Sequence, residues 1–115
     1  MVELSAQQQQ QRADPALARL LAAVVQELAP VEVWLFGSRA EGRARADSDY
    51  DLLVVLPNDA PAESLDMVRA WWLGSRVGVP ADIVPCTKRE FDEEKGVVDT
   101  LPRAAWLRGE RIYER

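Results

Sequence analysis

Two aspartates stand one residue apart at the mouth of an apolar run, and no other feature constrains the chain as much. Asp49 and Asp51 border the run Leu52 to Leu56, and together these residues predict a strand over 50–56. Because the side chains of a strand alternate between its two faces, both carboxylates project onto the same face. Two acids on one face of a strand mouth outline a site for a cation.

A glycine–serine pair ends an earlier apolar run. The run Val31 to Phe36 predicts a strand, and Gly37 and Ser38 follow it. Glycine lets backbone N–H groups approach phosphate closely, and Ser38 would add a hydroxyl group and the N-cap of a short helix over 38–42. We expect the two strands to be antiparallel, because Gly37 at the end of one must meet Asp49 at the start of the other.

The acids and the turn together predict a site where metal and phosphate meet. Mg²⁺ prefers oxygen ligands and is usually held by one or two carboxylates plus substrate phosphates. A third acid, Asp82, lies in the short apolar run 81–85, which predicts another strand. A carboxylate is costly to bury between apolar neighbours without a partner, and a metal ion would be that partner. The alternative is that these aspartates only mark strand entries and turns, where aspartate is common.

Two arginines follow the glycine–serine pair. Arg39 and Arg43 would add positive charge to the phosphate pocket, or they are solvated surface charges. Gly37 and Gly42 have the spacing of a P-loop, but Arg43 and Ala44 replace the lysine and the Ser/Thr of that motif. The chain therefore has no P-loop.

Composition excludes several classes of protein. The 115 residues include no histidine, which removes Ser-His-Asp triads and histidine zinc sites. The net charge of −5 argues against direct nucleic-acid binding, which depends on clustered Lys and Arg. The single cysteine, Cys86, is expected to fill a strand end. No apolar run approaches the roughly 18 residues needed to span a membrane, and no leader is visible, so we expect a cytoplasmic protein.

The remaining pattern predicts one domain over 14–115 after a flexible extension over 1–13. Asp14 and Pro15 have the pattern of a helix N-terminus. Thr87 and Glu90 form a capping box before a short helix. The other expected elements are helices over 15–28, 62–77 and 99–108 and a short end at 112–113. Trp71 and Trp72 on the helix over 62–77 are expected to take part in helix packing, or to form the edge of a partner surface, rather than a base-stacking platform, and packing is favoured.

These residues resemble a known family. Gly37-Ser38, ten residues, Asp49-x-Asp51, an apolar strand and a later Asp82 are similar to the minimal nucleotidyltransferase group of the DNA polymerase β-like superfamily, from about residue 17 to the tail at 109–113. The resemblance implies an α/β (α+β) fold with a small mixed sheet flanked by helices.

The resemblance also implies the roles of the site residues. Asp49, Asp51 and Asp82 would bind two Mg²⁺ ions and carry the catalysis, and Asp82 could take the proton of the nucleophile. Gly37, Ser38 and Arg39 would bind the phosphates of ATP. Glu41 and Tyr50 stand where many relatives carry arginine and isoleucine, which leaves the rate and the choice of nucleotide open.

Small stand-alone members of this group resemble the antitoxins of MNT–HEPN toxin–antitoxin pairs. The resemblance implies transfer of AMP from ATP to a tyrosine of a partner HEPN ribonuclease toxin, in a hetero-oligomer with that toxin. Two alternatives remain. The chain could cover a toxin without catalysis, through Trp71, Trp72 or Trp106, or it could modify a small polycation such as an aminoglycoside.

Overall fold

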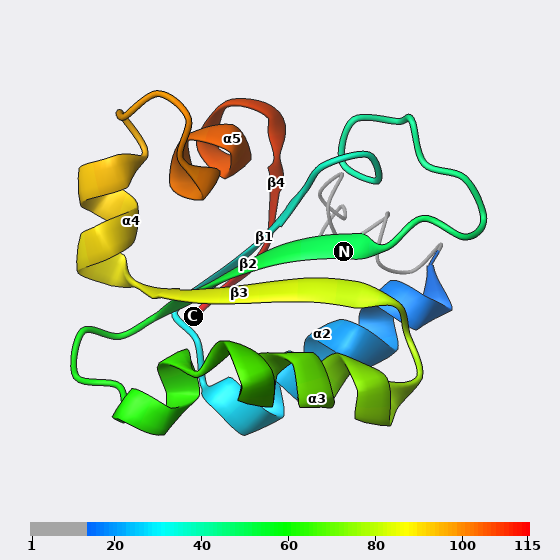
Figure 1. Cartoon of the computed structure of the whole chain (residues 1–115), viewed down its shortest axis with the longest axis horizontal. Coiled ribbons are helices and arrows are strands. Elements are labelled where there is room, and N and C mark those ends of the chain that lie inside the picture. The colour runs from blue at the N-terminus through cyan, green and yellow to red at the C-terminus, as the bar shows by residue number, and fades with distance from the viewer. Residues whose placement is uncertain (1–13) are drawn as a thin grey trace, which may run out of the picture.

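A four-stranded mixed sheet organises the protein, with helices on both of its faces (Figure 1). The computed structural model describes residues 14–115, so the extension expected over 1–13 lies outside the described residues. The elements in chain order are α2 (Pro15–Leu28), β1 (Glu32–Phe36), β2 (Tyr50–Leu56), the 3₁₀ turn η1 (Ala62–Leu65), α3 (Met67–Val77), β3 (Ala81–Thr87), α4 (Lys88–Glu94), α5 (Leu101–Arg108) and β4 (Glu110–Glu114). This architecture confirms the predicted fold class.

The strand order is β3-β2-β1-β4. β1 and β2 are antiparallel, as predicted, and β3 runs parallel to β2. The tail, for which only a short end was expected, forms β4 and pairs antiparallel with the other edge of β1. Both β3 and β4 are therefore edge strands, and the two central strands carry the Gly37 turn and the Asp49–Asp51 pair.

Alternation along the central strands builds a core on each face of the sheet. Leu52, Val54 and Leu56 pack with α2 and α3, whereas Leu53 and Val55 pack with Phe91 of α4 and Ala105 of α5. Figure 1 shows that α2 and α3 run along one face, while α4 and α5 cover the left part of the other. The right-hand end of that second face, where β2 and β3 begin, is left open by these two helices.

The predicted N-terminal caps of two helices are confirmed. The Asp14 carboxylate accepts a hydrogen bond from the N–H of Leu17 at 3.1 Å, with proline in the first turn. The capping box of Thr87 and Glu90 forms at the start of α4. Cys86 is buried at the end of β3, as expected.

Several predictions about helices are wrong. No helix forms over 38–42, where the chain makes consecutive turns instead. The helix expected over 62–77 is divided, because Asp66 is extended and its carboxylate caps α3 through the N–H groups of Val68 and Arg69. The last helix begins at Leu101 rather than Asp99, since Asp99 has φ +68° and Thr100 is the N-cap.

The expected packing of Trp71 and Trp72 inside the protein is wrong as well. Trp71 and Trp72 are 58% and 61% exposed, because the residues that α3 buries are Ala70, Leu73 and Gly74. No helix within residues 14–115 is long and apolar enough to cross a membrane.

Candidate active site

The three aspartates predicted to bind metal gather at the open end of the sheet. Asp49 directly precedes β2, and Asp51 is the second residue of that strand. Asp51 and Asp82 are partners in the parallel register of β2 and β3. Asp51 has the parity of Leu53, and Asp82 has the parity of Val84 and Cys86, so both lie on the face covered further along by α4 and α5. This placement agrees with the expectation that Asp82 faces the same side as Asp51, whereas the prediction that Asp49 shares this face stays a prediction, because Asp49 lies outside the strand.

Asp51 lies within the electrostatic reach of both other aspartates. Burial raises the pKa of Asp51, and the charges of Asp82 and Asp49 raise it further. Asp51 is only partly exposed, whereas Asp82 is exposed. The expectation that Asp82 is buried between apolar neighbours is therefore wrong, because β3 is an edge strand and Asp82 stands at its open end.

Gly37 lies against the carboxylate of Asp51. Phe36 is paired with Asp51 across β1 and β2, and the next residue turns away with φ +74°. A Cβ atom at position 37 would lie 2.2 Å from Oδ2 of Asp51. Glycine is thus required twice, by the left-handed backbone and by the space beside the carboxylate.

Ser38 offers polar groups next to that space. Among the described residues, nothing accepts a hydrogen bond from the Ser38 hydroxyl or from the N–H groups of Ser38 and Arg39. The Ser38 carbonyl instead accepts from the N–H of Arg43 at 2.9 Å within the turn. Without a helix over 38–42, phosphate would meet individual backbone N–H groups here and no helix dipole.

Arg39 fastens the loop between β1 and β2. Its Nε and one terminal nitrogen donate to the Ser48 carbonyl at 3.0 and 2.8 Å, and the terminal nitrogen also lies 3.3 Å from the carbonyls of Arg45 and Ala46. The hydrogen bonds that the structure shows for the Arg39 side chain are therefore to backbone carbonyls within residues 45–48, just before Asp49. Phosphate binding by Arg39 stays a prediction, and Arg43 pairs with Glu41 at the surface.

Tyr50 links the same loop to the first helix, a role that the sequence analysis missed. The Arg39 guanidinium lies 4.1 Å from the centre of the Tyr50 ring. The Tyr50 hydroxyl donates to the Asp14 carboxylate at 2.7 Å. Burial and this hydrogen bond raise the pKa of Tyr50. A tyrosine between two aspartates, with an acid at the predicted helix start, was the available signal.

The donor chemistry of the site fits a hard divalent cation. Carboxylate oxygens are the ligands that Mg²⁺ prefers, and two of them suffice when phosphates and water supply the rest. The space that a Cβ atom would fill at Gly37 lies beside Oδ2 of Asp51. In residues 14–115, no three His, Cys, Asp or Glu side chains already stand in position around a metal, so Asp82 as a third ligand stays a prediction.

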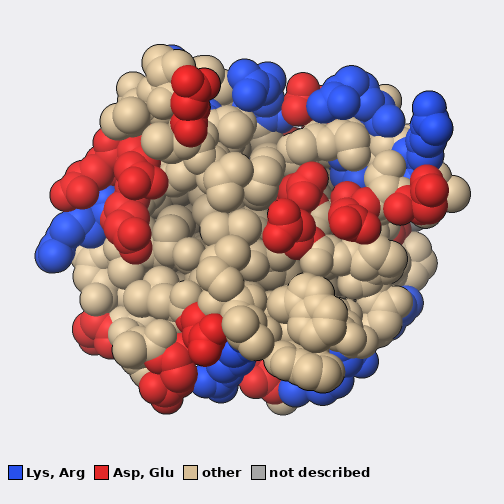
Figure 2. All heavy atoms as spheres, in the orientation of Figure 1, with Lys and Arg blue, Asp and Glu red and all other residues tan. Residues whose placement is uncertain are grey.

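A cleft of about 330 Å³ lies on the same face of the sheet as Asp51 and Asp82. Leu53 and Val84, which follow Asp51 and Asp82 by two residues, form part of its floor, and Glu90 and Glu94 of α4 form its far wall. Figure 2 shows this hollow between acidic side chains over α4 and others at the right-hand end of β2. Burial and both glutamates raise the pKa of Cys86 in the floor to about 12, so at neutral pH its thiol is protonated and a poor nucleophile.

Known structures share this fold. A toxin–antitoxin crystallised with AMP-PNP is 18% identical with a TM-score of 0.57, and the match covers 84% of this chain and 72% of that one. A proposed nucleotidyltransferase from Sulfolobus solfataricus is 21% identical with a TM-score of 0.57, over 100% of this chain and 93% of that one. At such identities the likeness shows the fold alone. No curated protein matches the chain.

The family model for the nucleotidyltransferase domain matches residues 17–104. The matched segment contains β1, β2 and β3 and ends within α5. Gly37 and the three aspartates all lie inside it. With this match over most of its length, the chain belongs to the nucleotidyltransferase domain family.

Proposed function

We propose that this protein is an antitoxin that transfers AMP from ATP to a tyrosine hydroxyl of a partner toxin of the HEPN ribonuclease class. The observation that carries the catalytic part is the meeting of Asp51 with Asp82 across β2 and β3, next to the Gly37 turn. The antitoxin part is supported by the resemblance of the motif and by the fold shared with a toxin–antitoxin crystallised with an ATP analogue.

The order of the strands suggests how the substrates lie. Gly37 and Ser38 follow β1, Asp49 and Asp51 belong to the start of β2, and Asp82 stands on β3. We assign the β- and γ-phosphates to the backbone N–H groups and hydroxyl of Ser38. The α-phosphorus then lies over Asp49 and Asp51, and the acceptor hydroxyl lies beside Asp82. The cleft lined by Leu53 and Val84 offers room for the nucleoside.

The reaction is an in-line displacement at the α-phosphorus. The tyrosine oxygen forms a bond to that phosphorus, and the bond from phosphorus to the bridging oxygen of the β-phosphate breaks. Pyrophosphate leaves on the β1 side, and the proton of the phenol passes to the Asp82 carboxylate and from there to water. Bound Mg²⁺, held by Asp49 and Asp51, would neutralise phosphate charge and lower the pKa of the attacking hydroxyl.

The test uses a HEPN-class toxin, sought in the reading frame next to that of this chain. With ATP and Mg²⁺, intact-mass spectrometry should show the toxin gaining the mass of one or more AMP groups, while a Tyr→Phe toxin at the mapped position gains none. The Asp49→Asn variant is the matched control, since it keeps the size and hydrogen-bonding shape of the side chain and removes its charge.

Two results would overturn the proposal. Silencing of the toxin with no change in its mass, equally by wild type and Asp49→Asn, would make the protein a stoichiometric binder. Transfer of AMP to a small polycation and not to the toxin would make it a small-molecule transferase.

A further inference from the structure

We propose that the exposed apolar face of α3 is the docking surface for the acceptor protein, and that this protein contributes a helix with apolar side chains flanked by acidic ones. The inference rests on the proposed function, because it names where the acceptor of that same site binds. Its evidence is an uncovered helix face, its charge, and its position beside Asp82.

The outer face of α3 is unusually apolar. Met67, Val68, Trp71 and Trp72 are between 51% and 64% exposed, and their spacing places them on one side of the helix. The opposite side buries Ala70, Leu73 and Gly74 against the protein. A helix that is apolar on both sides is normally covered on both, and tryptophans are the side chains that most often dominate binding energy at interfaces. We call these four exposed residues the α3 stripe.

The rings of Trp71 and Trp72 pack against each other in the absence of a partner. Their ring centres are 5.0 Å apart in an edge-to-face arrangement, which is a favourable aromatic geometry. Little side-chain freedom would then be lost on binding, and preorganisation of this kind raises affinity.

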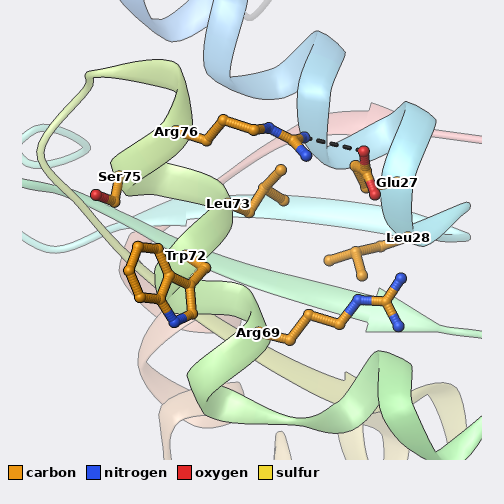
Figure 3. A pocket seen from close by; sticks show the side chains of 7 residues that line it. All are labelled: Glu27, Leu28, Arg69, Trp72, Leu73, Ser75 and Arg76. Carbon is orange, nitrogen blue, oxygen red and sulfur yellow. Dashed lines mark hydrogen bonds and ion pairs between the residues drawn. The ribbon is translucent and has the colours of Figure 1, made fainter.

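Arginines border the α3 stripe on the side of α2. A groove of about 370 Å³ runs between the two helices, and Trp72, Leu73 and Leu28 line it. Figure 3 shows Arg69 and Arg76 extending from α3 toward α2 along this groove. Arg76 pairs with Glu27 at 2.9 Å, whereas the charge of Arg69 has no ion-pair partner among residues 14–115. In a protein of net charge −5, this face therefore favours an acidic partner.

The positive charge beside the α3 stripe also favours a different protein over a second copy of this chain as the partner. A two-fold dimer through the α3 stripe would bring the same patch of each copy together. Both copies would then bring their arginines to one interface, where the α3 stripe of neither copy supplies a carboxylate for Arg69. An acidic helix from another protein supplies the carboxylate that Arg69 lacks.

The α3 stripe leads to the active site. A second groove, of about 200 Å³, runs from Trp71 to Pro80 and Ala81, and Ala81 directly precedes Asp82 on the edge strand β3. In Figure 2 a broad uncharged surface over the right-hand part of α3 lies beneath the acidic side chains at the start of β2. Because pyrophosphate would leave on the β1 side, an in-line acceptor must enter from the β3 side. A protein docked on α3 stands on that side.

The experiment measures affinity without nucleotide. Isothermal titration calorimetry with the protein encoded beside this chain compares wild type with Trp71→Ser, Trp72→Ser and Arg69→Glu. We expect each tryptophan variant to lose at least about 30-fold in affinity and Arg69→Glu about 10-fold. Matched controls at exposed positions elsewhere, Val98→Ser and Arg89→Glu, should stay within about threefold. Thermal melting of every variant verifies that the fold is intact.

Three results would overturn the docking surface: no complex with the wild-type chain, unchanged affinity of the tryptophan variants, or a dimer of the isolated chain in sedimentation that Trp72→Ser converts to monomer. The Asp49→Asn variant separates this inference from the proposed function. It should bind the partner with full affinity, so a complex that forms through α3 but transfers no AMP would leave the surface standing and remove only the catalytic proposal.

Discussion

The backbone of Gly37 lies so close to the carboxylate of Asp51 that only glycine fits at position 37. A Cβ atom on Gly37 would lie 2.2 Å from Oδ2 of Asp51, and the glycine has φ +74°. The turn that would receive phosphate and the carboxylate that would hold metal are therefore in direct contact. A change at either residue acts on the other.

Gly37→Ala should damage both the fold and the site. The left-handed backbone alone costs about 1–2 kcal/mol with a Cβ atom, and the clash with Asp51 adds about 1–3 kcal/mol. Gly42→Ala is the matched control, since Gly42 has φ +73° and open space around it. Urea denaturation should show the larger loss for Gly37→Ala, and calorimetry should show weaker Mg²⁺–ATP binding for that variant alone. Equal losses in both variants would mean that the contact with Asp51 carries no energy.

Asp51→Asn should stabilise the metal-free protein at neutral pH. Burial and the charges of Asp82 and Asp49 raise the pKa of Asp51 in the folded state, so the ionised carboxylate opposes folding. The stability of wild type should rise as the pH falls through this raised pKa toward the ordinary aspartate range, near pH 4. The difference from Asp51→Asn should shrink over the same interval. Melting curves in EDTA from pH 4 to pH 8 measure it.

Mg²⁺ should reverse the order of stability of wild type and Asp51→Asn. Mg²⁺ neutralises the repulsion between the carboxylates, so wild type should gain thermal stability when Mg²⁺ and ATP are added. Asp51→Asn should gain much less. A variant less stable than wild type in EDTA at pH 7, or one that gains equally with Mg²⁺, would contradict the account of Asp51 as a metal ligand that repels its neighbours.

Local signals predicted those parts of the fold that short-range contacts stabilise. The alternation around Asp51 and the caps at Asp14 and Thr87 act within a few residues, and each formed as expected. Long-range contacts decided the rest. The turn after Ser38 is held by the Arg39 side chain, which bonds to carbonyls six to nine residues away.

Other features depend on neighbours that the sequence does not identify. β4 has the residues Glu-Arg-Ile-Tyr-Glu and becomes a strand by pairing with β1. Asp82 is exposed because β3 lies at the edge of the sheet. Trp71 and Trp72 face outward because α2 and the sheet take the other side of α3. At the site, the spacing of the aspartates in the sequence was enough to predict them as site residues. The link from Asp14 through Tyr50 to Arg39 could not be predicted in this way, because it requires three distant segments to meet.

Arg39→Lys should make the loop between β1 and β2 more mobile even when no nucleotide is bound. Lysine keeps the charge but lacks the planar fork that reaches several carbonyls at once. We expect hydrogen exchange of residues 39–48 to accelerate about 10-fold in the absence of ATP, with kcat reduced because Asp49 is less well held. Arg43→Lys is the control, as the Arg43 side chain pairs with Glu41 at the surface. Normal exchange together with weaker ATP binding would instead make Arg39 a phosphate ligand.

Tyr50→Phe should remove the hydrogen bond to Asp14 and keep the packing of the aromatic ring. The hydroxyl donates to a carboxylate at 2.7 Å, and a hydrogen bond to a charged group contributes about 1.5–3 kcal/mol. Because the pair is only partly buried, we expect a loss near 1 kcal/mol in the free energy of unfolding. Tyr113→Phe is the control, since no hydrogen bond to the Tyr113 hydroxyl occurs within residues 14–115. Equal stability of Tyr50→Phe and wild type would remove the link as a stabilising contact.

Asp82→Ala and Ser38→Ala should affect transfer in opposite ways. Asp82 stands on β3, on the side from which the proposed acceptor would enter, so its loss should lower kcat about 100-fold or more, as expected for a lost proton acceptor, with the KM for ATP nearly unchanged. Ser38 would contact the leaving phosphates, so its loss should raise the KM for ATP several-fold and leave much of kcat. Steady-state assays of AMP transfer with saturating partner protein measure both constants. If Asp82→Ala weakens ATP binding as much as turnover, Asp82 is a nucleotide ligand, and if Ser38→Ala leaves the KM unchanged, the phosphates lie elsewhere than the Gly37 turn.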